Sequence, residues 1–396
     1  MAFPFHSHCM PGRKTGETGR LPKPFGSGIM RSKKGSVDMA KKLLIGISIF
    51  LGVVVLAVAG LVGWLTVREY KPAAVEDVDV WNQDVQLPPL APGDSLTVLS
   101  QNTGYAGLGK DSDFFMDGGK DVAPTREQED INRNGLTAQL LEQGADVYFL
   151  QEVDTDSSRS GGIDQSMCYW DRLGTFYSSS HTLNYSCDFV PFPWPPIGKV
   201  HSGLQTLSHF HVDRAERIAL PCPFSWPVSA ANLKRCLLVS YVPLEGTDKE
   251  LVLVNLHLEA YDDGEGKAAQ TKVLMDFLTG EYEKGNYVIA GGDFNQIFPG
   301  SLDFFPIQDP EQWTPGVLEQ DMLPDGWRFA CDLSTPSCRL LNHPYDPNPE
   351  GNQFYVIDGF ILSPNVALDS AETLDLQFEY TDHNPVSIRV TLKDEA

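Results

Sequence analysis

The longest uninterrupted apolar run limits the architecture of this chain more than any other feature. Residues 43–67 (LLIGISIFLGVVVLAVAGLVGWLTV) include no charged side chain in 25 positions. A helix needs about 20 apolar residues to cross the hydrocarbon core of a bilayer, and the apolar core of a signal peptide is usually shorter. We therefore predict a transmembrane signal-anchor helix over 43–67 rather than a helix buried in a soluble core.

The residues that flank this run predict its orientation. Five basic residues lie just before it, at 31–42, namely Arg31, Lys33, Lys34, Lys41 and Lys42. Only Arg68 and Lys71 follow closely. By the positive-inside rule the N-terminus lies in the cytoplasm of a single-pass cell-membrane protein. We predict a disordered basic cytoplasmic tail over 1–42, a proline-containing linker over 68–94, and an extracytoplasmic domain over 95–396.

Charge is divided unevenly between the two sides of the apolar run. Of 30 Lys and Arg and 53 Asp and Glu residues, 1–71 hold 11 and 3, which leaves 19 and 50 for 72–396. The net charge of the second part is therefore −31. A surface this acidic repels polyanions at long range, which makes bulk nucleic acid a poor partner. A small phosphorylated substrate held through a metal ion is less affected.

Cysteine usage agrees with an oxidising compartment. Six cysteines follow residue 71, and neighbours in sequence suggest the disulfide pairs 168–187, 222–236 and 331–338. Six cysteines allow 15 pairings, and buried reduced thiols are the alternative. No CxxC or CxxH spacing indicates a zinc site.

The domain is predicted to consist of strands with few helices between them. Strand composition is found at 96–102, 147–153, 236–242, 251–258, 287–292, 353–363 and 386–392. Helical spacing is found at 127–144 and 266–278. The prolines of 189–196 (FVPFPWPP) oppose regular structure, so 155–231 is expected to form loops around the mouth of a cleft. Frequent strands and few helices predict sheets covered by helices.

Polar side chains of catalytic type stand where these strands end. They are Asn102, Glu152, His257, Asp293, Asn295 and Asp358, and Asp382 and His383 come just before the last strand. Any one of them could be a turn cap or a core residue. Because sites of α/β folds gather at strand ends, the whole set predicts a single cleft.

Metal-assisted phosphoester hydrolysis is the chemistry that this set predicts. Glu152, Asp382 and the amide oxygen of Asn102 are hard donors, which suit Mg²⁺, Mn²⁺ or Ca²⁺. Such an ion stabilises charge at phosphorus. Asp358 would orient His383, which would act as general base toward water or support the transition-state phosphate. His257 is the expected general acid.

Five motifs carry a family resemblance. In order they are QEVD (151–154), NLHLE (255–259), GGDFN (291–295), VIDGFILS (356–363) and TDHNPV (381–386). They resemble those of the endonuclease/exonuclease/phosphatase superfamily, which is similar to deoxyribonuclease I, although Thr381 stands where serine is commoner. The resemblance covers roughly 95–394. It implies an α/β fold, a four-layer α/β/β/α sandwich, here behind one transmembrane helix, in a membrane-anchored member of bacterial type.

The resemblance also implies a role for each matching position. Glu152 would be the principal metal ligand with Asn102 beside it, and Asp382 would be a second metal-site or phosphate-site residue. Asp293 and Asn295 would orient the attacking water and the phosphate. A histidine at position 257 is found in nuclease-like, sphingomyelinase-like and inositol-phosphatase-like members, and it disfavours a DNA-repair role.

The predicted function is hydrolysis of a phosphodiester or phosphomonoester in a small phosphorylated compound or a lipid headgroup. An extracellular nuclease is the first alternative, because acidic nucleases can recruit cations. A catalytically inactive binding domain is the second, although no acidic or histidine position of the motifs is lost. The aromatic segment 168–196 could contact lipid, a sugar or its own loop. The glycine-rich segment 104–120 is expected to be a loop rather than a phosphate cradle.

Overall fold

The apolar run forms the C-terminal part of a single long helix, α1 (Met30–Val67). In this computed structural model, residues 30–81, 86–174, 176–262 and 264–394 are described. Over 38–67 the helix is long and apolar enough to cross a membrane by length and composition. Residues 30–42 are helical rather than disordered, because Lys, Met and Ala propagate a helix readily. The rest of the predicted tail lies outside the described residues.

The chain divides into two compact units, 1–60 and 61–396, and every strand of the described residues belongs to the second. The first of its two large sheets has seven strands in the order β1 (Val75–Val78), β7 (Arg214–Ala219), β8 (Cys236–Pro243), β9 (Glu250–His257), β10 (Tyr287–Asp293), β16 (Asp358–Leu362) and β13 (Arg328–Ala330). The second has the order β17 (Val366–Thr373), β18 (Val386–Leu392), β3 (Ser95–Asn102), β4 (Val147–Asp154), β6 (Gly198–Ser208), β5 (Ser178–Val190) and β2 (Val80–Trp81). Two small pairs join β11 (Gln296–Ile297) to β12 (Gly316–Val317) and β14 (Cys338–Arg339) to β15 (Phe354–Tyr355).

The two large sheets pack face to face around an apolar core. Val98 and Phe149 of the second sheet belong to the same buried cluster as Leu253, Ile289 and Phe360 of the first. Alternate residues of each strand point into this layer, as the period of a strand requires. Burying two apolar faces against each other is what holds the sheets together.

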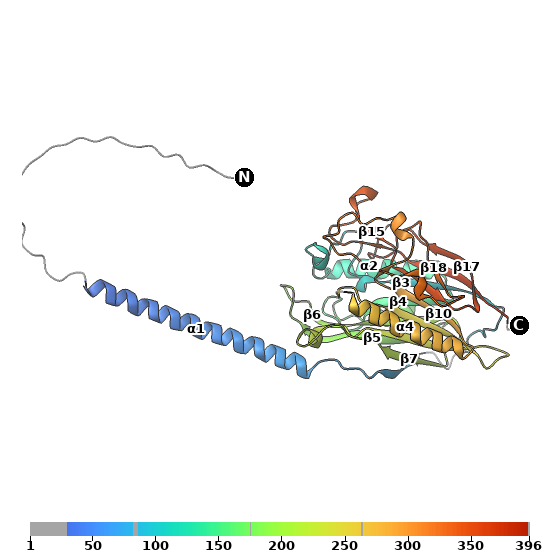
Figure 1. The fold of residues 1–396 in the computed structure, drawn as a ribbon, viewed down its shortest axis with the longest axis horizontal. Coiled ribbons are helices and arrows are strands. Elements are labelled where there is room, and N and C mark those ends of the chain that lie inside the picture. The colour runs from blue at the N-terminus through green and yellow to red at the C-terminus, as the bar shows by residue number, and fades with distance from the viewer. Residues whose placement is uncertain (1–29, 82–85, 175, 263, 395–396) are drawn as a thin grey trace, which may run out of the picture. The chain divides into compact units, whose positions relative to one another are not determined.

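Helices cover the outer faces of both sheets (Figure 1). Helix α4 (Glu265–Glu283) packs Leu274 and Leu278 against the first sheet. Helix α2 (Arg126–Gln143) packs Leu136 and Leu140 against the second, together with α3 (Gln165–Leu173). Thr125 caps α2 and Gly144, with φ of 55°, ends it. The predicted four-layer α/β/β/α sandwich is confirmed.

Two parts of the sequence prediction differ from this fold. The segment 155–231 is not mainly loop, because it contains α3 and the strands β5, β6 and β7. Its proline-rich stretch is the loop between β5 and β6. Within the predicted linker 68–94, β1 pairs with β7 and β2 with β5, so this stretch contributes an edge strand to each sheet.

The disulfide prediction is not supported by the structure. All six described cysteines are free thiols: Cys168, Cys187, Cys222, Cys236, Cys331 and Cys338. Three of them are fully buried, as free cysteine commonly is. The predicted external location of the domain therefore depends on the charges that flank α1.

Candidate active site

The predicted site residues meet because their strands end at one edge of the sandwich. In the first sheet Asp293 of β10 is directly opposite His257 of the parallel strand β9 and Asp358 of the antiparallel strand β16. In the second sheet β3 and β4 run parallel and bring Asn102 and Glu152 to the same edge. The antiparallel strand β18 begins there, just after Asp382 and His383.

Two glycines in GGDFN are required by close packing of the backbone. A Cβ atom on Gly292, where φ is 146°, would lie 2.0 Å from the carbonyl oxygen of Leu256 on β9. A Cβ atom on Gly291 would lie 2.2 Å from the ring of Phe360. Side chains at either position would force β10 away from its neighbours. The glycines thus allow Asp293 to approach His257 and Asp358.

Asp293 is the centre of the polar network. Its Oδ2 accepts a hydrogen bond from Asn102 Nδ2 at 3.0 Å and lies 3.4 Å from His257 Nε2 and 3.8 Å from His383 Nε2. Its Oδ1 accepts from the backbone N–H of Asn295 at 2.8 Å. Burial and the neighbouring Asp358 raise the pKa of Asp293 to about 7. A carboxylate with such a pKa can take a proton from water near neutral pH.

Asn102 and Glu152 lie side by side, as predicted. Asn102 Nδ2 donates to Glu152 Oε1 at 3.3 Å, and its Oδ1 accepts from the N–H of Gly104 at 3.0 Å. Glu152 occupies an irregularity between Leu150 and Val153, where its φ is 55°. Positive φ is costly for a residue other than glycine and concentrates at functional sites. The irregularity turns Glu152 into the cleft between its buried neighbours.

Asp358 and His383 form the predicted dyad. Asp358 Oδ2 is 2.8 Å from His383 Nδ1 and also accepts a hydrogen bond from Ser337 Oγ at 2.8 Å. Burial alone would lower the pKa of His383, but Asp358, with smaller contributions from Cys338 and Asp382, holds that pKa well above its usual value. The imidazole is therefore protonated near neutral pH. Of the two predicted roles, this favours support of a phosphate oxygen from Nε2.

His257 has the opposite electrostatic environment. Burial, then the charges of Arg235 and His383, lower its pKa well below the usual value. Its Nε2 is near Asp293, and its Nδ1 has no hydrogen-bond partner among the described residues. A neutral imidazole donates one N–H, so His257 can offer a hydrogen bond to a substrate oxygen. Its predicted role as general acid stays a prediction.

A sequence model described as the Endonuclease/Exonuclease/phosphatase family matches residues 109–383. The chain belongs to this family. The matched range spans more than two thirds of the chain and includes every site residue except Asn102. Members of the endonuclease/exonuclease/phosphatase family are generally hydrolases of phosphoesters.

Solved structures agree on the fold. An endonuclease/exonuclease/phosphatase from Beutenbergia cavernae DSM 12333 is 17% identical, with a TM-score of 0.52, over 76% of this chain and 72% of that one. A functionally unknown conserved protein from Enterococcus faecalis V583 is 13% identical, with a TM-score of 0.50, over 75% of this chain and 100% of that one. A search of curated proteins finds no match.

The side chains at the site fit the divalent cation that many members of this family use. Oxygen donors of Asp293 and Asp358 lie within 4.8 Å of each other. Asp358 Oδ1 is buried and accepts no hydrogen bond from the described part of the chain. Burial and Glu152 raise the pKa of Asp382 to about 6, although His383 opposes this. Such crowded carboxylates suit Mg²⁺, Mn²⁺ or Ca²⁺. Of the three predicted ligands, Glu152 and Asp382 would hold the ion, which would neutralise phosphate oxygens. The amide oxygen of Asn102 accepts a hydrogen bond from the N–H of Gly104, and its role as a ligand stays a prediction.

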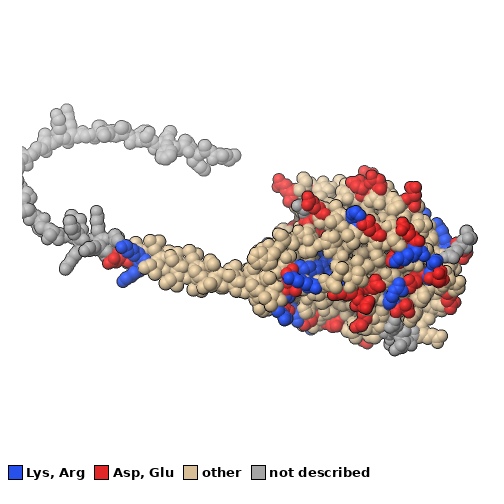
Figure 2. Space-filling view, turned by 60° about the horizontal axis from the view of Figure 1, so that its bottom comes forward, with Lys and Arg blue, Asp and Glu red and all other residues tan. Residues whose placement is uncertain are grey.

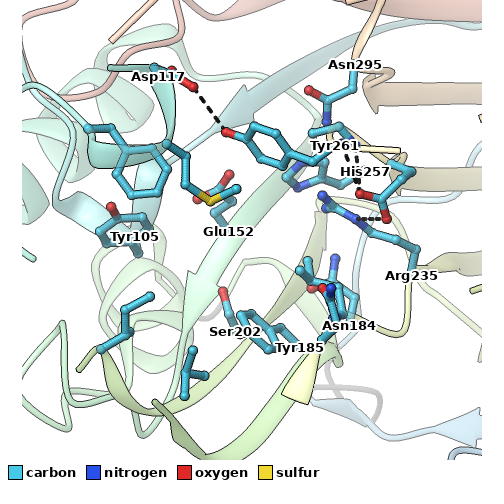
Figure 3. A pocket seen from close by; sticks show the side chains of 18 of the residues that line it. Tyr105, Asp117, Glu152, Asn184, Tyr185, Ser202, Arg235, His257, Tyr261 and Asn295 are labelled. Carbon is cyan, nitrogen blue, oxygen red and sulfur yellow. Dashed lines mark hydrogen bonds and ion pairs between the residues drawn. The ribbon is translucent and has the colours of Figure 1, made fainter. Parts of the chain in front are cut away.

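A cleft of about 710 Å³ opens in front of these residues. Glu152 and His257 face the same space in Figure 3, with Asp117 and Tyr261 on one side and Tyr185 on the other. Tyr261 donates a hydrogen bond to Asp117 at 3.3 Å. Asp117 comes from the glycine-rich segment 104–120, so this predicted loop forms one wall of the cleft.

Arg235 is a cleft residue that sequence reasoning missed. Its side chain is 5% exposed and lies 3.9 Å from Glu259. Its Nε and Nη1 have no hydrogen-bond partner within the residues that the structure covers. A single arginine just before a strand carries no sequence signal. A buried guanidinium with free donors beside His257 can bind a phosphate oxygen of a substrate.

Proposed function

We propose that this protein is a membrane-anchored, divalent-metal-dependent phosphoester hydrolase whose domain lies outside the cytoplasm. One observation carries the proposal. Carboxylates, an imidazolium dyad and a neutral histidine from five separate segments converge at one cleft. Hydrolysis needs a cation site, a group that accepts a proton from water, and donors for the phosphate oxygens. The substrate would be a small phosphorylated compound or a lipid headgroup.

The chain's own residues divide this work. Asp293, with a pKa near neutrality, would take a proton from the attacking water. His383, held in its charged form by Asp358, would donate to an oxygen of the phosphate. His257, next to Asp293, and Arg235 line the same cleft and would orient the ester. Asn102 would hold Glu152 and Asp293 in register through its amide N–H groups.

Full-length protein in detergent should hydrolyse bis-p-nitrophenyl phosphate when Mg²⁺ or Mn²⁺ is added. The rate should fall to background with EDTA and in Glu152→Ala, since the principal oxygen donor for the ion is then gone. Exposed Glu311→Ala is a matched control that should keep full activity. A folded protein without metal-dependent turnover on diesters, monoesters or nucleic acid would support an inactive binding domain instead.

The acidic surface argues against the nuclease alternative. Acidic and basic side chains are interspersed on the face shown in Figure 2, but residues 72–396 as a whole have a net charge of −31. Turnover of DNA or RNA faster than of small diesters would favour the nuclease over the proposed substrate class.

A further inference from the structure

The cleft continues from the candidate active site to an apolar rim. Phe192, Pro227 and Val228 line it at one end, together with Val62 and Leu65 from the last turns of α1. Phe192 and Val228 are nevertheless 70% and 57% exposed. Phe192 faces Phe115 across the cleft, with ring centroids 6.1 Å apart. The rim is thus a solvent-exposed apolar surface attached to a polar catalytic floor.

Two tryptophans extend this rim outside the cleft. Trp194 is in the loop that joins β5 to β6 and is 89% exposed, and Trp226 precedes the short helix η3 (Val228–Ala231) and is 63% exposed. Fully exposed tryptophan is rare on a soluble surface but is enriched at the interface between membrane and water. Exposed apolar groups that cluster in this way mark an interaction surface.

Contacts between this surface and the C-terminal end of α1 indicate where the surface would lie relative to the membrane. Leu61 and Leu65 pack against Val190, Val200 and Ala230. Trp226 Nε1 donates a hydrogen bond to Thr66 Oγ1 at 2.9 Å. The apolar run ends at Val67, so the residues that contact Leu61–Thr66 lie at the depth of the bilayer surface if α1 spans it.

Two ion pairs follow these apolar contacts, where α1 would leave the bilayer for water. Arg68 pairs with Asp188 at 2.6 Å, and Lys234 pairs with Glu69 at 3.0 Å. Both pairs come directly after the last apolar residue of α1. Only residues 68–74 separate α1 from β1. The apolar residues at the end of α1 therefore contact apolar residues of the domain, and the charged residues that follow them contact charged residues of the domain.

We infer that the cleft takes its substrate from the bilayer, and that the substrate is a phospholipid whose apolar part lies along the rim. The phosphate would reach the polar floor beside Glu152 and His257. Water oxygen would bond to phosphorus, one phosphorus–ester oxygen bond would break, and a water proton would pass to the departing oxygen. This inference rests on the proposed hydrolase function and specifies its substrate class.

The test uses full-length protein reconstituted into vesicles. Separate vesicles contain phosphatidylcholine alone or with phosphatidylglycerol, phosphatidylethanolamine or sphingomyelin, and phosphorus NMR detects released products with Mg²⁺ or Mn²⁺. Hydrolysis of bis-p-nitrophenyl phosphate is measured on the same samples. We expect turnover of at least one lipid. We also expect Trp194→Asp and Phe192→Asp to lower the vesicle rate at least fivefold more than the soluble-diester rate.

Phe304→Asp is the matched control, because Phe304 is 58% exposed but does not line the cleft. It should change neither rate. Metal-dependent turnover of the soluble diester with no lipid product overturns the inference and leaves the proposed function intact. Equal loss of both rates in the rim variants, or a dimer whose partner covers the rim, overturns it as well. No turnover of either substrate removes the proposed function itself.

Discussion

Replacing Asp293 by asparagine should stabilise the metal-free protein above neutral pH. Burial and the charge of Asp358 raise the pKa of Asp293 from 3.8 to about 7. At a pH between 3.8 and about 7, Asp293 is protonated in the folded state but ionised in the unfolded state. The free energy of unfolding therefore falls as the pH rises through this range. One pKa unit is about 1.4 kcal/mol, so ionising Asp293 costs the folded protein about 4 kcal/mol by pH 8.

Asparagine removes this charge but also removes one acceptor. Asp293 accepts from Asn102 through Oδ2 and from Asn295 through Oδ1, and an amide offers only one oxygen. The lost hydrogen bond costs about 1 kcal/mol. The expected net gain is therefore up to about 3 kcal/mol at pH 8. At pH 4.5 the two effects cancel, because the charge costs only about 1 kcal/mol there.

Thermal unfolding of full-length protein in detergent with EDTA measures this gain. A stabilisation of this size raises Tm by several degrees in a domain of this length. Exposed Asp325→Asn is the control and should leave Tm unchanged at both pH values. Excess Mg²⁺ should raise the Tm of the wild type more than that of Asp293→Asn, because ion binding offsets the buried charge. A variant that melts at or below the wild-type temperature at pH 8 would falsify the electrostatic argument.

Three further substitutions test separate parts of the site. Asp358→Asn should lower kcat on bis-p-nitrophenyl phosphate roughly 10²–10⁴-fold and shift the alkaline limb of its pH profile downward, since His383 loses its anionic partner; an unchanged profile would contradict the dyad. Arg235→Ala should raise KM about tenfold with a smaller change in kcat, and Arg235→Lys should show a smaller rise in KM. A loss in kcat alone would exclude substrate binding by Arg235. Asn255→Leu removes the shortest hydrogen bond of Gln151 Nε2 and the donor to the carbonyl oxygens of Leu150 and Gln205. It should lower the free energy of unfolding by roughly 1–3 kcal/mol in urea titration, and no change would show that water replaces the lost amide.

The sequence predicts the central strands and the polar residues at their ends because each strand is a short apolar run that is followed by a residue of catalytic type. Strands β3, β4, β9 and β10 are short apolar runs, and each ends in a residue that chemistry can use. Parallel neighbours share an edge, so the meeting of these residues follows from topology. Their exact contacts do not follow. The position of Glu152 depends on an irregularity of β4 that leaves no mark in the sequence.

Strands β5 and β6 escaped prediction because their buried face is polar. Ser178, Ser179 and Ser180 are almost fully buried in β5. Ser178 Oγ donates to the carbonyl oxygens of Ser208 and Phe210, and Ser180 pairs with Ser240 across the sheets. Hydrogen bonds replace apolar contacts there, so no alternation of apolar and polar residues marks the strand. The disulfide prediction was wrong because an even cysteine count contains no information on distance.

A buried amide pair beneath the cleft links the two sheets at the level of the site. Gln151 Nε2 donates to Asn255 Oδ1 at 2.8 Å, and Asn255 Nδ2 donates to the carbonyl oxygens of Leu150 and Gln205. Both side chains are fully buried, so any sliding of one sheet over the other would leave several polar groups unpaired at a cost of about 1–3 kcal/mol each. Gln151 immediately precedes Glu152, and Asn255 lies two residues before His257. The pair therefore fixes Glu152, on β4, relative to His257, on β9, and the packing of the two sheets sets the distance between these two candidate site residues.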